Sequence, residues 1–133
     1  MTHVLENFGL QLVPKASARA VSYEIQQGGV EIGFITLGGS NWTRHGRQPA
    51  LGFGIYAAAR GKKHAAKAVC MLTRHAFDTL GMDELIVSTN INNISCQRTM
   101  EKTGYMLCAE DEVRPGSICY RASRATWQLP QFT

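Results

Sequence analysis

At a basic turn in the middle of the chain, the hydrophobic period of the sequence changes from that of a strand to that of a helix. ALGFGIY at 50–56 reads as a strand, in which Gly52 and Gly54 permit a bulge or a close backbone approach. From Ala65 to Leu80, apolar residues recur three and four positions apart, which predicts one face of a helix that ends before Gly81. DELIVSTN at 83–90 predicts a buried strand. This order predicts a right-handed crossover between two parallel strands.

Strand patterns surround this unit on both sides. AVSYEIQ at 20–26 alternates apolar and polar residues, and VEIGFITL at 30–37 follows two glycines, so a β-hairpin is predicted. The polar segment 38–49 is predicted to be a loop. Asn93 is expected to cap a short helix that runs to Lys102 and ends at Gly104. Further strands are predicted at 105–110 and 118–129, with a turn at 114–117.

These elements predict one α/β domain over residues 1–133. Its sheet is expected to be mixed and mostly antiparallel, with a central parallel pair of strands and helices on its faces. The chain has 133 residues, of which 44% are hydrophobic, enough for a substantial core.

Charge and cysteine content exclude several classes of function. The net charge is +4, and only residues 60–63 and 42–48 concentrate basic side chains, which argues against a general nucleic-acid surface. The four cysteines have neither CxxC spacing nor a histidine at metal-ligand spacing, so no metal site is expected. Cys70 falls in the helical pattern, where a buried free thiol is expected. No signal peptide or membrane-spanning run is evident, and a cytoplasmic location is expected.

The basic turn precedes the predicted long helix. A helix N-terminus has unpaired N–H groups and a partial positive charge, which suit a phosphate. Arg60 and Lys62 add charge, and Ala65 and Ala66 keep bulk away. A phosphate site and an ordinary solvated helix start are both compatible with this pattern.

Three motifs in order resemble the GNAT acetyltransferase superfamily. They are LGFGIYAAARGKKHAAKAV at 51–69, HAFDTLGMDELIVSTN at 75–90 and NISCQRTMEKTGY at 93–105. The closest likeness is to ribosomal-protein N-terminal and spermidine acetyltransferases. The resemblance implies the acyl-CoA N-acyltransferase fold, acetyl-CoA as cofactor and an amine acceptor.

The resemblance also implies positions for the cofactor. Backbone groups of the central strand would bind the pantetheine arm, the basic turn would bind the pyrophosphate, and residues of the short helix would contact the arm or the adenosine phosphates. The residues implied for the pantetheine arm are Phe53, Ile55 and Tyr56. Those implied for the pyrophosphate are Arg60, Gly61, Lys62, Lys63, His64 and Ala65. Those implied on the short helix are Asn93, Cys96 and Lys102.

Three positions depart from the family pattern. Lys63 replaces a glycine that lets phosphate approach the backbone, so either its side chain turns outward from a helical backbone or the loop shifts. Ala50 stands where many relatives have a proton-relaying carboxylate. Met100 stands where many have a tyrosine that protonates the departing thiolate.

Candidate proton carriers each have an alternative role. Cys96 is a candidate acid or a small filler beneath the short helix. His45 is a candidate base or an exposed loop histidine. His64 either contacts phosphate or faces solvent. Tyr56 contacts a ligand or packs at the strand end.

Two functions remain open. The leading hypothesis is an acetyl-CoA-dependent N-acetyltransferase that acts on a protein N-terminus, a polyamine or a small amine. The alternative is a catalytically impaired member that acts as a CoA-binding regulatory or interaction module. Residues 1–19 are too short for the two helices that relatives have between their first strands. The acceptor side is therefore expected to be open or completed by a second subunit, and a homodimer is expected.

Overall fold

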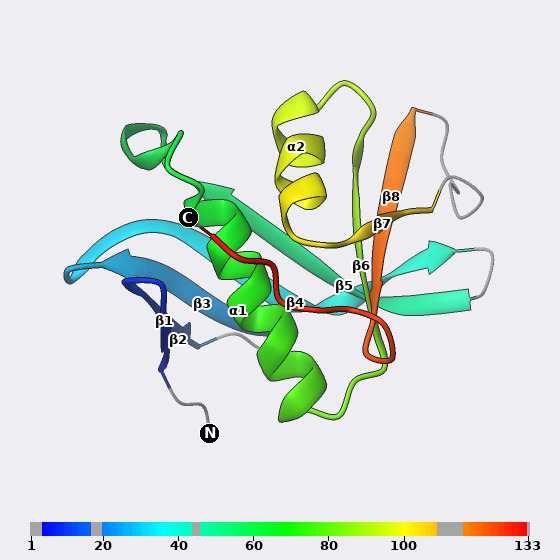
Figure 1. Cartoon of the computed structure of the whole chain (residues 1–133), viewed down its shortest axis with the longest axis horizontal. Helices are drawn as coiled ribbons and strands as arrows, with labels where there is room; N and C mark the ends of the chain where they lie inside the picture. Colours follow the sequence, from blue (N-terminus) through cyan, green and yellow to red (C-terminus); the bar gives the residue numbers. More distant parts are fainter. Residues whose placement is uncertain (1–3, 17–19, 44–45, 109–115, 133) are drawn as a thin grey trace.

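One mixed sheet contains every strand of the computed structural model, which describes residues 4–16, 20–43, 46–108 and 116–132 (Figure 1). The strand order is β1-β2-β3-β4-β5-β6-β8-β7, and every neighbouring pair except β5–β6 is antiparallel. The strands are β1 (Leu5–Asn7), β2 (Leu10–Lys15), β3 (Ala20–Gln27), β4 (Val30–Thr43), β5 (Gly46–Ile55), β6 (Glu84–Asn90), β7 (Met106–Leu107) and β8 (Ser117–Ser123). The helices are η1 (Ala57–Ala59), a single 3-10 turn, α1 (His64–Asp78) and α2 (Ile94–Lys102).

The predicted parallel pair is confirmed, and it is very short. β5 and β6 pair only at Ala50 and Ile86. Beyond this bridge the two strands diverge, and Figure 1 shows β5 running toward the start of α1 while β6 runs toward α2. The sheet therefore opens along the carboxyl-terminal half of β5.

The hairpin of β3 and β4 is confirmed, but the predicted loop at 38–49 is wrong. Gly28 and Gly29 form the turn with φ values of 59° and 82°. β4 then continues to Thr43, and β5 begins at Gly46, with Trp42 paired to Arg47. A two-stranded extension satisfies its backbone hydrogen bonds across the pair, so it needs no apolar alternation. The predicted close approach at Gly54 is confirmed, because a Cβ there would lie 2.7 Å from the Phe34 ring.

The core lies between α1 and one face of the sheet. The helix buries a stripe of apolar side chains against apolar residues of β2 to β6, which include Leu12, Ile25, Ile35, Leu37, Leu51 and Leu85. The helix ends at Asp78, since the N–H groups of Thr79 and Leu80 both bond to the His75 carbonyl. Gly81 follows with φ 71°, as the sequence predicts. Leu80 lies beyond the last turn and is 42% exposed, so it is not part of the stripe.

The second helix begins and ends where the sequence predicts. The Asn93 side chain accepts a hydrogen bond of 3.1 Å from the Cys96 N–H, and Gly104 has φ 83°. The predicted strand at 118–129 is wrong beyond Ser123. There the Thr126 and Trp127 N–H groups bond back to the Ser123 carbonyl. Of the strand predicted at 105–110, only Met106 and Leu107 pair with β8. Residues 109–110 and the first two residues of the turn at 114–117 lie outside the described residues.

Two strands that the sequence did not predict precede β3. β1 and β2 form an antiparallel hairpin, and β2 pairs with β3 from Gln11 to Lys15. Helices do not occur among residues 4–16. Cys70 is a buried free thiol, as expected, and burial raises its pKa to about 12. Among the described residues, no helix combines the length and apolar character of a bilayer-spanning segment.

A buried hydroxyl pair links α1 to the segment after α2, and it gives a stability test. Thr73 Oγ1 lies 2.6 Å from the Tyr105 hydroxyl, and both side chains are at most 5% exposed. Tyr105→Phe should lower the free energy of unfolding by about 1–2 kcal/mol, because the Thr73 hydroxyl loses its partner. In the double variant Tyr105→Phe with Thr73→Val, the loss in free energy of unfolding should be smaller than the sum of the losses in the two single variants. Urea denaturation measures both, and an unchanged midpoint in Tyr105→Phe would contradict the assignment.

Candidate functional site

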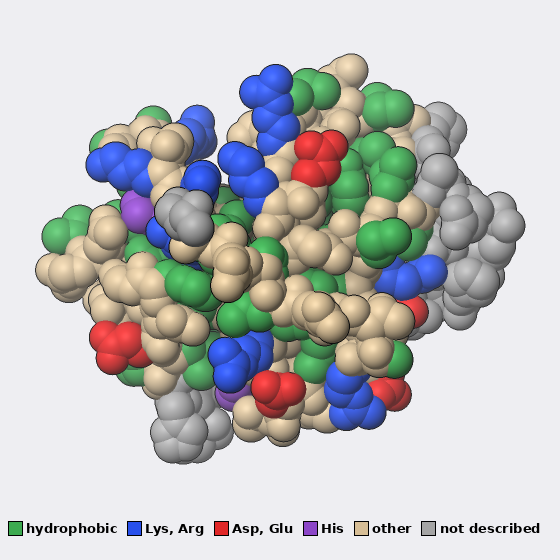
Figure 2. Space-filling view, viewed as in Figure 1, with side chains coloured by type: hydrophobic (Ala, Val, Ile, Leu, Met, Phe, Trp, Pro, Cys, Tyr) green, Lys and Arg blue, Asp and Glu red, His purple; other side chains and the backbone are tan. Residues whose placement is uncertain are grey.

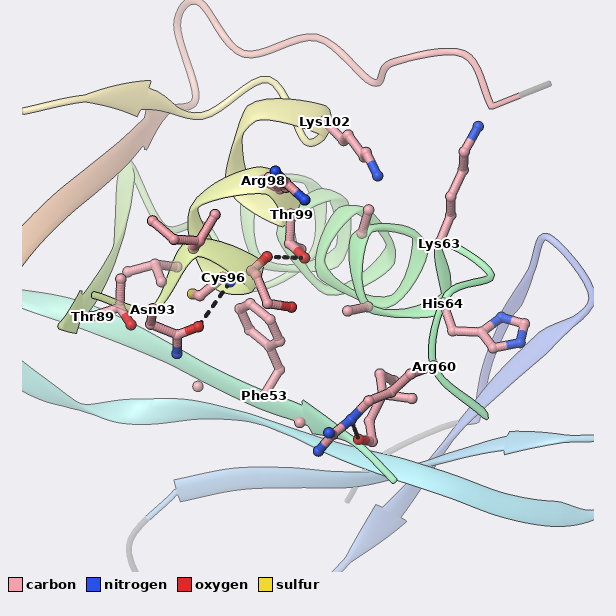
Figure 3. A pocket seen from close by; sticks show the side chains of 18 of the residues that line it. Phe53, Arg60, Lys63, His64, Thr89, Asn93, Cys96, Arg98, Thr99 and Lys102 are labelled. Atoms are coloured by element: carbon pink, nitrogen blue, oxygen red, sulfur yellow. Dashed lines mark hydrogen bonds between the residues drawn. The ribbon is translucent and has the colours of Figure 1, made fainter. Parts of the chain in front are cut away.

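A pocket opens where β5 and β6 diverge, and both helices contribute to its walls (Figure 3). Its volume is about 820 Å³. The lining residues come from β5, the turn before α1, the end of β6 and α2: 51–55, 59–61, 63–66, 87–89, 93–96, 98, 99 and 102.

The β5 wall presents backbone groups to this pocket. The Tyr56 N–H donates to the Ile32 carbonyl of β4 over 2.8 Å. Because hydrogen-bonding direction alternates along a strand, the N–H and C=O groups of Phe53 and Ile55 point away from β4, toward the gap. Arg60 Nε donates to the Ile55 carbonyl over 2.8 Å, which agrees with this direction. The β5 wall is therefore an open strand edge inside the sheet.

The N-terminus of α1 is uncapped and opens on the same pocket. Its first turn contains no acidic residue, and no side chain accepts from its N–H groups. The first bond of the helix joins the Lys67 N–H to the Lys63 carbonyl, so the preceding amides have no partner within the helix. Lys63, Ala65 and Ala66 all line the pocket. Unpaired N–H groups and the helix dipole make this end of the pocket suitable for an anion.

Lys63 adopts a left-handed backbone conformation, which a glycine would accept without strain. Its φ is 64° and its ψ is 17°, which is the left-handed region. A helical backbone and a displaced loop were the two outcomes expected from the sequence, and neither describes this residue. A left-handed backbone costs a residue with a Cβ about 1–2 kcal/mol. The turn thus has a backbone geometry that suits glycine and carries an ammonium group at this position.

His64 is buried beside this turn rather than exposed to solvent, so the solvent-facing alternative is wrong. Its side chain is 6% exposed, and neither ring nitrogen has a hydrogen-bond partner. Burial lowers its pKa, and the charges of Lys67 and Lys62 lower it further. The imidazole is therefore neutral at pH 7. Contact with a phosphate stays a prediction.

Basic side chains flank the pocket from two elements. Arg60 and Lys63 come from the turn before α1, and Arg98 and Lys102 come from α2. Figure 2 shows Lys and Arg side chains on both sides of a hollow between these elements. None of the lining residues is acidic. The pocket therefore favours an anionic ligand. Arg98 was missed by sequence reasoning, although its spacing of four from Lys102 was a usable signal.

The start of α2 contributes Asn93 and Cys96. The side-chain oxygen of Asn93 caps the helix, and the side-chain NH₂ group of Asn93 remains on the pocket side (Figure 3). Cys96 is half-buried and also packs against the core. Burial raises the pKa of its thiol, and a hydrogen bond with Thr89 acts in the opposite direction. The thiol is therefore protonated at neutral pH.

Of the twelve residues that the resemblance implies for the cofactor, ten line the pocket, and Tyr56 and Lys62 do not. Tyr56 neither packs at the strand end nor enters the pocket. Its hydroxyl donates to Glu31 Oε2 over 2.6 Å, and this bond is the main cause of its raised pKa. Lys62 is exposed and does not line the pocket.

The remaining candidate positions lie elsewhere. Met100 is completely buried in the core, so it does not reach the pocket. Ala50 lies at the parallel bridge itself. His45 lies outside the described residues. Within the described part of the chain, His, Cys, Asp and Glu side chains form no group of three that could hold a metal ion.

Comparisons with known proteins agree with this geometry. Residues 3–106 match the family model described as an acetyltransferase (GNAT) domain. No curated protein matches the sequence significantly. The fold is similar to that of an acetyltransferase from Agrobacterium tumefaciens str. C58, with a TM-score of 0.79 and 19% identity over 92% of this chain and 95% of that chain.

Two ligand-bound structures are also similar. Mycobacterium smegmatis RimJ in complex with CoA-disulfide gives a TM-score of 0.63 and 18% identity, over 79% of this chain and 53% of that chain. Campylobacter jejuni N-acetyltransferase PseH in complex with acetyl coenzyme A gives a TM-score of 0.64 and 10% identity, over 80% of this chain and 70% of that chain. These likenesses confirm the predicted fold class.

The left-handed backbone at Lys63 leads to a stability prediction. Lys63→Gly should raise the free energy of unfolding by about 1 kcal/mol relative to Lys63→Ala, because alanine keeps the steric cost and glycine removes it. Both variants lose the same charge, so alanine is the matched control. Thermal and urea denaturation measure the difference. Equal stability of the two variants would show that residue 63 does not hold a left-handed conformation in solution.

Proposed function

Because the chain belongs to the GNAT acetyltransferase family, we propose that it transfers an acetyl group from acetyl-CoA directly to a primary amine. The observation that carries this proposal is the uncapped start of α1, which faces an open edge of β5 across a pocket without acidic side chains. The family match does not favour the alternative of an inactive coenzyme-binding module.

The residues of the pocket fit the coenzyme. The amide-containing pantetheine arm can form strand-like hydrogen bonds with the gap-facing groups of Phe53 and Ile55. The diphosphate suits the unpaired N–H groups from Gly61 to Ala66, beside the charge of Lys63. Arg60 fastens this turn to the end of β5 through the Ile55 carbonyl. When bound, the coenzyme supplies an acetyl group activated as a thioester.

The chain's own groups then have three tasks in acetyl transfer. A backbone N–H must polarise the thioester carbonyl, and a gap-facing N–H of β5 that the pantetheine arm leaves free is proposed for this task. The amine must arrive neutral. Because position 50 is an alanine, no carboxylate at that position can take a proton from the amine. His45 stays a predicted base outside the described residues. The departing thiolate needs a proton, and we assign its delivery to Cys96, whose thiol is protonated at neutral pH. The proton that the amine loses on acetylation then restores the Cys96 thiol.

The acceptor and the assembly are further proposals. A protein N-terminus, a polyamine and a small amine are all candidate acceptors, and membership of the ribosomal-protein N-terminal or spermidine branch stays a prediction. A homodimer through the C-terminal strands also stays a prediction. β7 lies at the sheet edge, and there Met106 and Leu107 are 70% and 55% exposed.

Coenzyme binding and turnover test the proposal in two steps. Acetyl-CoA and CoA should raise the melting temperature in a concentration-dependent way, since a ligand of the native state stabilises it by mass action. ATP, which lacks the pantetheine arm, should give a smaller shift. Free-thiol release across a panel of amines then measures transfer. The absence of any shift at millimolar acetyl-CoA would contradict the proposed function.

Cys96 gives a separate prediction about the reaction. Cys96→Ala should lower kcat by about 10²-fold, the lower end of the usual range for general acid–base help, with little change in KM for acetyl-CoA. Cys96→Ser, which keeps a proton donor of similar size, should retain more activity. A kcat within about twofold of the parent in Cys96→Ala, together with a lower melting temperature, would instead identify Cys96 as a packing residue.

A further inference from the structure

Two cysteines lie opposite each other on adjacent strands at the edge of the sheet. The last pair of the β7–β8 ladder is Leu107 with Tyr120. One residue further, the Cys108 N–H donates to the Cys119 carbonyl over 2.8 Å, so the two cysteines are the next residues to face each other. Directly opposite side chains in an antiparallel pair lie on the same side of the sheet. Cys108 and Cys119 are therefore neighbours on one side of β7 and β8.

This side of the sheet is the one that α1 does not cover. Tyr120 belongs to the core beneath α1, and side chains alternate along a strand, so Cys119 faces the opposite way. Both cysteines pack with Ile86 in a small buried cluster that is separate from that core. Cys70 and Cys96 belong to α1 and α2 and lie outside this cluster. The pair is thus set apart from the other two thiols of the chain.

The spacing of such a pair suits a covalent link between the two sulfurs. Directly opposite residues that share a backbone hydrogen bond have Cα atoms about 5.5 Å apart in an antiparallel pair. Disulfides commonly join residues whose Cα atoms are about 4.4–6.8 Å apart. All four cysteines of the chain are free thiols, so both sulfurs are in the reduced state that an oxidant attacks.

The position at the sheet edge gives an oxidant a route to these sulfurs. Cys108 and Cys119 are only 6% and 4% exposed. However, β7 has two residues and pairs with β8 alone, whereas β8 also pairs with β6 along its whole length (Figure 1). Local opening of β7 therefore breaks few backbone bonds, and it exposes Cys108 before the rest of the fold unfolds.

We infer that Cys108 and Cys119 form a redox modification site, at which a hydroperoxide produces an intramolecular disulfide that ties β7 to β8. The inference stands apart from the proposed function, since neither cysteine lines the coenzyme pocket. The stabilisation comes from the closed segment between residues 108 and 119, which restricts the unfolded chain.

The reaction with hydrogen peroxide proceeds in two balanced steps. The Cys108 thiol loses its proton, and its sulfur attacks one peroxide oxygen; the O–O bond breaks, a sulfenic acid forms, and the departing hydroxide takes the proton to become water. The Cys119 thiol then loses its proton, and its sulfur attacks the Cys108 sulfur; the S–O bond breaks, and the second hydroxide leaves as water. Two electrons pass from the two sulfurs to the peroxide, which yields one disulfide and two water molecules.

Peptide mapping of the oxidised full-length chain tests the inference directly. The reduced, folded protein is treated with hydrogen peroxide, its remaining thiols are alkylated, and the denatured chain is digested with a glutamate-specific protease. Cleavage after Glu110 or Glu112 separates the two cysteines in sequence, so their peptides stay joined only through a disulfide. The joined peptides should be the main product, and dithiothreitol should separate them. The oxidised protein should also melt about 5–10 °C above the reduced protein.

Matched variants assign the two effects to this pair. Cys108→Ser and Cys119→Ser should each abolish the intramolecular disulfide and the rise in melting temperature. Cys96→Ser removes a thiol outside the cluster, so it should retain both effects. The map of the parent chain decides the inference by itself if a variant fails to fold.

Three results would overturn the inference. The first is a map in which Cys108 and Cys119 remain free or are oxidised only to sulfinic acid, which dithiothreitol does not reverse. The second is a disulfide that joins either residue to Cys70, to Cys96 or to a second chain. The third is a Cys108–Cys119 disulfide that leaves the melting temperature unchanged, which would show that the edge is not secured.

Discussion

The single parallel bridge between Ala50 and Ile86 is the constraint on which the rest of the structure depends. A parallel pair requires a crossover, and here α1 provides it, so the start of α1 comes to lie beyond the end of β5. Because pairing stops after one bridge, the gap-facing polar groups of β5 remain open toward β6 instead of joining a ladder. Longer pairing between β5 and β6 would close the pocket. Without the bridge, no backbone pairing would hold β6 beside β5.

Core packing is what allows the strained turn at the pocket to persist. The left-handed backbone at Lys63 costs about 1–2 kcal/mol. Each large side chain that α1 buries, such as Leu72 or Phe77, contributes about 1.5–3 kcal/mol. Several such residues fix α1 on the sheet, so packing outweighs the local strain and the repulsion among nearby cations. The neutral His64 is a second local cost, since its buried nitrogens have no hydrogen-bond partner. Both costs fall in the turn that is proposed to bind the anion, where function commonly tolerates them.

The sequence predicts the parts of the fold that depend on apolar periodicity and capping. It places α1, α2 with its Asn93 cap, the β3–β4 hairpin and the parallel pair correctly. It misses the extension of β4 and β5, because a two-stranded ribbon is held by backbone bonds that carry no side-chain pattern. It also misses β1 and β2, and it extends the last strand past Ser123, where Trp127 instead donates to the Thr103 carbonyl.

The motifs in the sequence identify most of the residues that line the pocket, but they do not predict the conformations of these residues. The left-handed backbone of Lys63 and the burial of His64 depend on how the turn docks on the sheet. The position of Arg98 depends on how α2 faces α1. Tertiary packing sets these properties, so they could not be read from local sequence.

Backbone amide NMR of the protein during titration with acetyl-CoA tests the central claim most directly. If the gap between β5 and β6 and the start of α1 hold the coenzyme, the largest shift changes will fall on Phe53, Ile55, residues 61–66 and Thr89. The amides of β2 and β3 will change little. Changes centred on β2 and β3, or on the exposed edge at β7, would contradict the account.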